Sequence, residues 1–402
     1  MMERAGFVHC IVDRSTQEAP APAPSLQEDN LPKKEPLSAK PDSAKQYSRL
    51  KLLIDLFRSA LIFLFTLLLL ALGVTSRMEE TVRSLVSHDY LVLLGFALLF
   101  GTLETLLTFP LSYASGYSLE HKFGLSNQTL RKWLWEGLKG MLVGICLTVP
   151  LLFALFYFLR NFGSLWWIPV GILIFAFSVL LARIAPLIIF PLFYKFRSLQ
   201  EGNLKECIIA LCDKVGMKIS GVFVFDMSKN TKKANAAFTG IGKSKRIVLG
   251  DTLIANFTDD EIETVFAHEL GHFKLHHLRS MMLIGALSTF AGLFLTAVLY
   301  EESLSWFGLG SVDTIAALPL LGLWLGLYSL VTTPPGNVVS RAFEREADRY
   351  AIRTTGKKES FINALQKLAR VNLADPSPHP LIEFLFHSHP SIEKRIQAVE
   401  RL

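Results

Sequence analysis

Two histidines four residues apart, with a glutamate directly after the first, occur in the segment His268-Glu-Leu-Gly-His272. On a helix this spacing puts both imidazoles on one face, where they can bind one Zn²⁺ and the glutamate can act on a metal-bound water. Thr258 and Glu261 form the pattern of a capping box before this segment. The pattern therefore predicts a zinc-binding helix with Glu269 as general base. The alternative is a solvated helix rich in His and Glu.

A catalytic zinc site needs three protein ligands and an open position for water. Further along the chain, Glu344 and Asp348 are four residues apart in a predicted helix and share a face. One of these carboxylates can bind the metal while the other orients a ligand imidazole. Glu346 lies on a different face of the same helix and is a weaker candidate.

Two further histidines compete for the third ligand position. His276 lies one helical turn beyond His272, and His277 follows it. Three ligands stacked on one straight helix would span about 12 Å, which is too far for a single ion to touch both ends. His276 is therefore interpreted as a neighbour of the site and not as a ligand.

The composition indicates a membrane protein. The chain has 402 residues, of which 51% are hydrophobic. Uncharged apolar runs are long enough to cross a bilayer as helices, which needs about 20 residues. The predicted spans have their apolar cores at about 59–74, 90–112, 140–159, 161–182, 280–300 and 314–334. The net charge of +6 comes without a basic run interleaved with aromatics, so we expect no nucleic-acid partner.

Lysine and arginine are distributed unevenly about the predicted spans. The segments 1–58, 119–139 and 195–279 are rich in basic residues, whereas the loop 301–313 contains none. Because cytoplasmic loops carry the excess of basic residues, the pattern predicts a cytoplasmic N-terminus and a cytoplasmic metal-binding segment.

The expected fold is mainly α, a polytopic helical membrane protein with about six transmembrane helices and a small α+β catalytic domain. Strands are predicted at 222–226 and 246–249, and helices at 203–215, 340–354 and 358–371. The predicted divisions are a disordered polar tail at 1–46, transmembrane helices 1–4 at 47–195, a catalytic region at 196–279, helices 5–6 at 280–336 and a second catalytic region at 337–402.

From about residue 119 to the C-terminus, the sequence resembles the type-I CAAX prenyl endopeptidases and the related bacterial membrane metallopeptidases of the heat-shock quality-control type. The matching segments follow one another in order: Glu120-His-Lys-Phe-Gly, Pro191-Leu-Phe-Tyr-Lys-Phe, Asp226-Met-Ser-Lys, Asn235-Ala-Ala-Phe-Thr-Gly, Lys245-Arg-Ile-Val-Leu-Gly, His268-Glu-Leu-Gly-His272, Phe343-Glu344 to Asp348, and Ser388-His389-Pro390 with Arg395. The eukaryotic CAAX enzymes have seven spans, and six are predicted here.

The resemblance implies a zincin-like catalytic domain in which Glu344 is the third zinc ligand and Asp348 orients a ligand from behind. It further implies that the segment Asn235, Ala236, Ala237, Phe238 is an edge strand that binds the substrate peptide by strand addition. His389 and Arg395 resemble the pair that contacts the substrate and the oxyanion. Taken alone, His389-Pro390 reads as a turn leading into a helix.

Glu104 and Arg183 are charged residues inside otherwise apolar spans. Charges there are costly and usually face a cavity or one another. The water-filled chamber of the resembled family gives them a place as cavity-lining residues. The alternative is that one or both lie near a membrane interface, where their charged ends reach water.

The predicted function is an integral-membrane endopeptidase with one Zn²⁺ per chain, acting on a peptide or membrane-tethered protein, prenylated in the CAAX case. The alternative within this class is a quality-control protease without prenyl specificity. A receptor or transporter with a structural zinc is the alternative from another class. Glu269 argues against it, because a structural site has four protein ligands and no adjacent base. We expect a bacterial inner membrane in preference to the endoplasmic reticulum.

Overall fold

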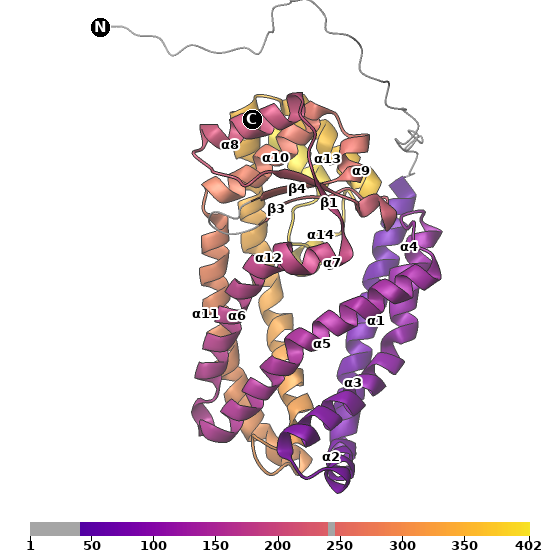
Figure 1. The fold of residues 1–402 in the computed structure, drawn as a ribbon, viewed down its shortest axis with the longest axis vertical. Coiled ribbons are helices and arrows are strands. Elements are labelled where there is room, and N and C mark those ends of the chain that lie inside the picture. The colour runs from indigo at the N-terminus through magenta and orange to yellow at the C-terminus, as the bar shows by residue number, and fades with distance from the viewer. Residues whose placement is uncertain (1–40, 240–245) are drawn as a thin grey trace, which may run out of the picture. The chain divides into compact units, whose positions relative to one another are not determined.

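Residues 41–239 and 246–402 are described by the structure, a computed structural model (Figure 1). Within these ranges six helices are long and apolar enough to cross a membrane, as the sequence predicted. Large apolar side chains such as Leu64 and Leu106 lie exposed along them, which suits contact with lipid tails. The six segments are Asp42–Ala71, Asp89–Lys122, Leu130–Asn161, Gly163–Phe193, His277–Phe307 and Ile315–Thr355.

The helices of the first half of the chain are joined by short turns. They are α1 (Pro41–Ala71), α2 (Val74–Leu85), α3 (Asp89–Tyr113), α4 (Leu119–Lys122), α5 (Leu130–Asn161), α6 (Trp167–Ile184) and α7 (Phe190–Phe193). Trp166 and Tyr300 are fully buried in a cluster that packs α6 against the later membrane helices. This cluster holds the membrane helices that carry the catalytic elements in position relative to one another.

The catalytic elements lie together at one end of the long helices (Figure 1). They are β1 (Phe196–Ser198), α8 (Asn203–Lys214), β2 (Val222–Phe225), β3 (Ala236–Thr239), β4 (Arg246–Gly250), α9 (Asp251–Asn256), α10 (Asp259–Lys274), α11 (His277–Ser303), α12 (Leu318–Thr355), α13 (Lys358–Asn372), α14 (Pro380–Phe386) and α15 (Ile392–Glu400). α11 and α12 belong to both parts, because each begins or ends at the catalytic end and also crosses the membrane.

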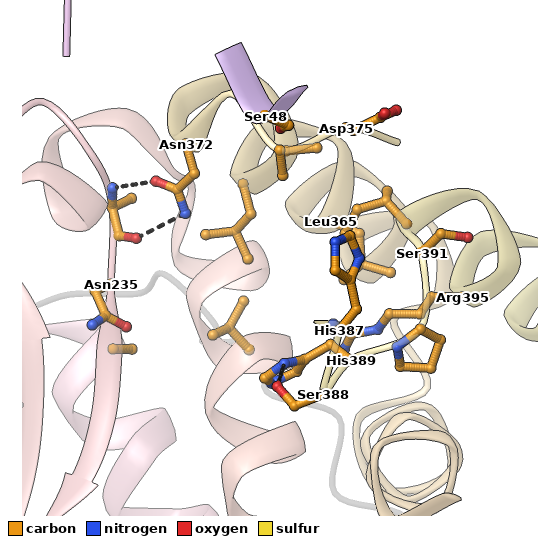
Figure 2. A pocket seen from close by; sticks show the side chains of 18 of the residues that line it. Ser48, Asn235, Leu365, Asn372, Asp375, His387, Ser388, His389, Ser391 and Arg395 are labelled. Carbon is orange, nitrogen blue, oxygen red and sulfur yellow. Dashed lines mark hydrogen bonds between the residues drawn. The ribbon is translucent and has the colours of Figure 1, made fainter. Parts of the chain in front are cut away.

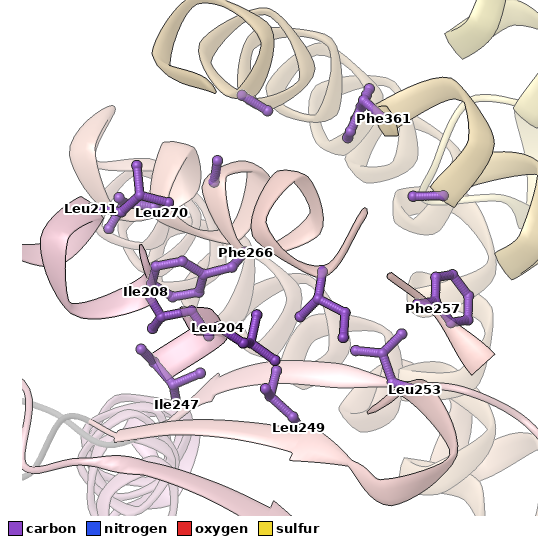
Figure 3. Packing of buried hydrophobic residues seen from close by; sticks show 14 of the residues in the cluster. Leu204, Ile208, Leu211, Ile247, Leu249, Leu253, Phe257, Phe266, Leu270 and Phe361 are labelled. Atoms are coloured by element: carbon purple, nitrogen blue, oxygen red, sulfur yellow. The ribbon is translucent and has the colours of Figure 1, made fainter. Parts of the chain in front are cut away.

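Four strands form one sheet in the order β1-β2-β4-β3. β2 and β4 are parallel, whereas β3 pairs antiparallel with β4 and forms one edge of the sheet. Ile247 and Leu249 of β4 are buried against Ile208 of α8 and Phe266 of α10 (Figure 3). Burial of these side chains holds the sheet against α10. Strand β3, at the edge of the sheet, also contacts that helix.

The sixth span and the helix that carries Glu344 are one helix. α12 runs for 38 residues from Leu318 to Thr355, with Pro334 and Pro335 inside it. The sequence predicted two elements here, 314–334 and 340–354, and the two prolines, which usually end or kink a helix, lie at their junction. That prediction was wrong. Beyond the prolines, α12 packs against α10 at Glu344 and Ala347, and this packing holds the helix together there.

The predicted tail at 1–46 extends too far. Residues 1–40 lie outside the described residues, but α1 begins at Pro41. Ala44 and Tyr47 are buried with Leu119 and Leu373, contacts that no local pattern reveals. These tertiary contacts bring the 41–46 segment into the helix, where proline is tolerated at the first turn.

Candidate metal centre and active site

The helix α10 has the start that the sequence predicted. The Thr258 side chain accepts from the Glu261 backbone N–H at 3.3 Å, and the Glu261 carboxylate accepts from the Thr258 backbone N–H at 2.9 Å. This reciprocal pair satisfies two N–H groups that a helix end leaves free. The cap defines where α10 begins and therefore which face its two histidines share.

Gly271 allows α10 to approach α12 closely. A β-carbon at this position would lie 3.1 Å from the Ala347 Cα and 3.2 Å from the Tyr350 side chain. Such a distance to backbone is tighter than ordinary van der Waals contact. The glycine within the motif therefore permits the contact that brings the carboxylates of α12 to the histidines of α10.

Three potential ligand atoms meet where these helices cross. The Nε2 atoms of His268 and His272 are 3.2 Å apart, and they lie 3.3 and 3.2 Å from the two carboxylate oxygens of Glu344. All three ligand atoms fall within 4.8 Å of one another. Two imidazole nitrogens and one carboxylate are the donor set of a hydrolytic zinc site.

The surroundings of Glu344 suit a bound cation. Its Oε2 atom is buried and accepts no hydrogen bond from the described residues, although His268 Nε2 lies 3.3 Å away. A buried carboxylate oxygen without a donor is costly unless a positive charge satisfies it. The residues present therefore fit a metal ion in contact with Glu344.

The outer nitrogen of His268 is held by a buried ion pair. Asp348 Oδ1 lies 2.8 Å from His268 Nδ1, and Arg395 donates to the Asp348 carboxylate from Nε at 2.9 Å and from Nη2 at 2.6 Å. All three side chains are buried. Asp348 thus lies between the His268 ring and Arg395.

Burial and charge act in opposite directions on His268. Burial lowers its pKa, but the adjacent carboxylates of Asp348 and Glu344 outweigh burial and raise the pKa to about 9. In the metal-free protein the ring is therefore protonated at neutral pH. A metal ion that binds Nε2 has to displace that proton.

His389 approaches the ligand cluster from the turn before α15. Its Nε2 lies 3.3 Å from Glu344 Oε1, and Ser388 Oγ lies 2.9 Å from its Nδ1. Burial and the charge of Arg395 lower the pKa of His389, against the opposing pull of Glu344. A pKa below the usual value favours the neutral form of this ring near neutral pH. The turn before a helix is also present, because Ser391 caps α15.

A cavity of about 590 Å³ adjoins the cluster. Glu269 and Arg395 line it, Asn235 and Ala236 form one side, and His389 lies on the other (Figure 2). The predicted base and the start of the edge strand thus face a common space. A peptide lying along β3 would pass between them.

One contact at this cavity was not anticipated from the sequence. The Asn372 side chain accepts from the Ala234 backbone N–H at 2.9 Å and donates to the Ala234 carbonyl at 3.2 Å (Figure 2). This double contact fixes the chain just before β3. Asn372 is 138 residues away in sequence, so no local pattern indicates the pairing.

Glu104 and Arg183 are not brought to this site. Glu104 lies on α3 and is half-buried, and Arg183 lies near the end of α6 and is exposed. Neither lines the cavity beside Glu269. Their assignment to a chamber between the helices stays a prediction.

Comparisons with known proteins cover both halves of the chain. Residues 198–402 match the family model for peptidase family M48, and residues 32–195 match that for the CAAX prenyl protease N-terminal region with five membrane helices. CAAX prenyl protease 1 of Saccharomyces cerevisiae is 34% identical over 328 residues, which cover 76% of this chain and 72% of that protein. The uncharacterized metalloprotease YhfN of Bacillus subtilis is 31% identical over 362 residues, 89% of this chain and 85% of that protein.

The fold agrees with these matches. The crystal structure of S. mikatae Ste24p aligns with a TM-score of 0.79 at 28% identity, over 92% of this chain and 91% of that one. The resemblance inferred from the ordered motifs is thereby confirmed, including its extension beyond the zinc motif. The polytopic helical architecture with a small sheet is confirmed as well. The chain belongs to peptidase family M48 and is a membrane-embedded metalloendopeptidase.

Proposed function

We propose that this metallopeptidase binds one Zn²⁺ through His268, His272 and Glu344 and cleaves prenylated, membrane-tethered substrates near their C-terminus. The observation that carries the proposal is the position of this ligand cluster beside a cavity lined by Glu269, by the start of an edge strand and by His389, which lies 3.3 Å from Glu344. The prenylated substrate rests on the identity with a yeast CAAX prenyl protease across most of both chains.

When bound there, Zn²⁺ supplies a Lewis acid that activates a water and polarises the scissile carbonyl. Glu269 takes the proton from the attacking water and passes it to the leaving amine. Its place on the cavity wall, one residue after a ligand, puts its carboxylate on the side from which water arrives.

His389 stabilises the oxyanion as a neutral donor. When the Ser388 hydroxyl donates to Nδ1, the ring carries its hydrogen on Nε2, the nitrogen that faces Glu344 and the cluster. A preorganised N–H aimed at developing charge lowers the barrier. Two nitrogens of Arg395 donate to Asp348, so Arg395 acts mainly by holding Asp348 behind His268. Its third nitrogen is left to reach the cavity.

The substrate binds as an added strand on β3. Ala236, Ala237 and Phe238 lie on this strand and Asn235 directly precedes it. Alternate residues along the strand offer their backbone N–H and C=O groups outward, since those of the others face β4. Strand addition gives affinity through the main chain and tolerates varied side chains. The Asn372 amide holds the chain at Ala234, just before this edge.

The catalytic end faces the cytoplasm. The loop 301–313, at the opposite end of α11, has no Lys or Arg, whereas the segments that reach the catalytic end are basic. A bacterial inner membrane is favoured by the match to the Bacillus protein over 89% of this chain.

Glu104 and Arg183 then line a polar path between the helices. Substituting both with Ala and finding membrane-substrate cleavage unchanged would contradict that role.

A farnesylated peptide and its unprenylated counterpart, offered to the purified protein, test the substrate. We expect hydrolysis of the bond after the modified cysteine, and faster turnover of the farnesylated peptide. Equal turnover of both peptides would contradict prenyl specificity and favour a general quality-control protease. Glu269→Gln is the matched control: it should keep its zinc and lose cleavage of both peptides.

A further inference from the structure

His272 has a partner on its outer nitrogen that differs from the partner of His268. His277 Nδ1 lies 3.1 Å from His272 Nδ1, and His277 Nε2 lies 3.0 Å from Glu346 Oε2. The His277 side chain is 4% exposed, whereas that of Glu346 is 47% exposed. His272, His277 and Glu346 thus form a series of contacts that leads from the ligand cluster to the surface.

The backbone at His276 makes this contact possible. His276 has φ of 60°, in the left-handed region, and stands between the end of α10 and the start of α11. A straight continuation of α10 would carry the next side chain away from His272. The turn instead folds the buried His277 ring back toward the cluster, where it stacks on Phe343 with centroids 4.3 Å apart.

The chemistry of the imidazole rings fixes which atom donates and which accepts in the hydrogen bonds from His272 to His277 and from His277 to Glu346. When Nε2 of His272 binds the metal, its Nδ1 carries the hydrogen and must donate. His277 Nδ1 must then accept, which leaves the hydrogen of His277 on Nε2, facing the Glu346 carboxylate. Each nitrogen and oxygen in this series of contacts has a complementary partner in this one arrangement.

We propose that His277, supported by Glu346, is a positioning residue that orients His272 and fixes its hydrogen on Nδ1 for metal binding. This inference rests on the proposed ligand role of His272. It gives a function to two residues that the sequence offered only as competing ligands. Among the described residues, the group able to hold the metal is completed by Glu344 and not by either of them.

The test is the zinc affinity of purified full-length protein, measured by competition with a chromophoric chelator. His277→Phe keeps a ring on Phe343 but removes the acceptor, and we expect zinc binding to weaken about 10- to 100-fold. Glu346→Ala should weaken it less, because water can reach the exposed end of this series of contacts. His276→Gly is the matched control: it removes the adjacent imidazole, suits the left-handed backbone and should leave zinc affinity unchanged.

A double-mutant cycle separates orientation from general destabilisation. In the His277→Phe background, Glu346→Ala should have no further effect on zinc affinity, since its effect passes through His277. Additive losses would overturn the proposal, and so would unchanged affinity in both single variants. Should His277→Phe fail to fold, unchanged affinity in Glu346→Ala alone would overturn it.

Glu344→Ala distinguishes failure of this inference from failure of the metal site itself. Loss of zinc in Glu344→Ala together with full affinity in His277→Phe would reject only the positioning role. Full affinity in Glu344→Ala would reject the proposed ligand set.

Discussion

The two ligand histidines are four residues apart on one helix, yet they are held by opposite kinds of partner. Behind His268 lies a buried ion pair, in which Asp348 is bound by two nitrogens of Arg395. Behind His272 lies the His277 ring, which is followed by a half-exposed carboxylate. One side is charged and enclosed, and the other is built from neutral rings and opens to water.

This difference sets how much each side contributes to stability. A buried charge that loses its partner remains desolvated, which costs several kcal/mol. A surface carboxylate that loses its partner is rehydrated at little cost. The Asp348 side should therefore decide whether the catalytic end folds, whereas the His277 side should tune metal affinity alone.

Removing the guanidinium of Arg395 should produce the largest effect. Arg395→Met keeps much of the side-chain volume but leaves the buried Asp348 with His268 as its one remaining partner among the contacts described above. We expect a loss of about 3–5 kcal/mol in unfolding free energy. Chemical denaturation of the purified protein measures this loss. Lys205→Met is the control, because its partner Glu201 is 85% exposed, and it should cost no more than about 1 kcal/mol. Equal losses in the two variants would contradict the comparison.

Gly271→Ala should affect both sides at once. Its β-carbon would meet the Ala347 backbone at 3.1 Å, so α10 and α12 would have to move apart. We expect about 1–3 kcal/mol of destabilisation together with weaker zinc binding. Gly285→Ala on α11 is the control, because a β-carbon there meets nothing within 4 Å. Unchanged zinc affinity in Gly271→Ala would show that the close approach does not set the ligand geometry.

A third prediction concerns pH and isolates the enclosed side. In zinc-free protein the pKa of His268 is raised to about 9 from 6.5. Its contribution to stability is thus fully present below pH 6.5 and is lost as the pH rises through about 9. We expect the melting temperature of zinc-free protein to fall over this window, and His268→Gln to fall less. Parallel profiles for the two proteins would contradict the assignment.

The sequence was sufficient where the chemistry is local. The histidine spacing and the capping box of Thr258 are periodic or adjacent patterns, and both appear on one helix as predicted. The pairing of Glu344 with Asp348 followed from a four-residue spacing, and the choice of Glu344 as the proposed ligand came from the resemblance.

The parts that could not be predicted depend on contacts between distant residues or on the sign of one backbone φ angle. The left-handed turn at His276 is occupied by a residue that usually avoids it, so nothing in the sequence indicated that His277 folds back. The hydrogen bonds between the Asn372 side chain and the Ala234 backbone join segments 138 residues apart. The continuity of α12 through Pro334 and Pro335 depends on packing that a proline rule does not include.

The zinc content of purified wild type, Glu269→Gln and Glu344→Ala tests the central claim most directly. We expect about one zinc per chain in wild type and in Glu269→Gln, because both keep three ligands, and little zinc in Glu344→Ala. Peptidase activity should be present in wild type alone. A full complement of zinc in Glu344→Ala, or undiminished cleavage by Glu269→Gln, would contradict the proposed site.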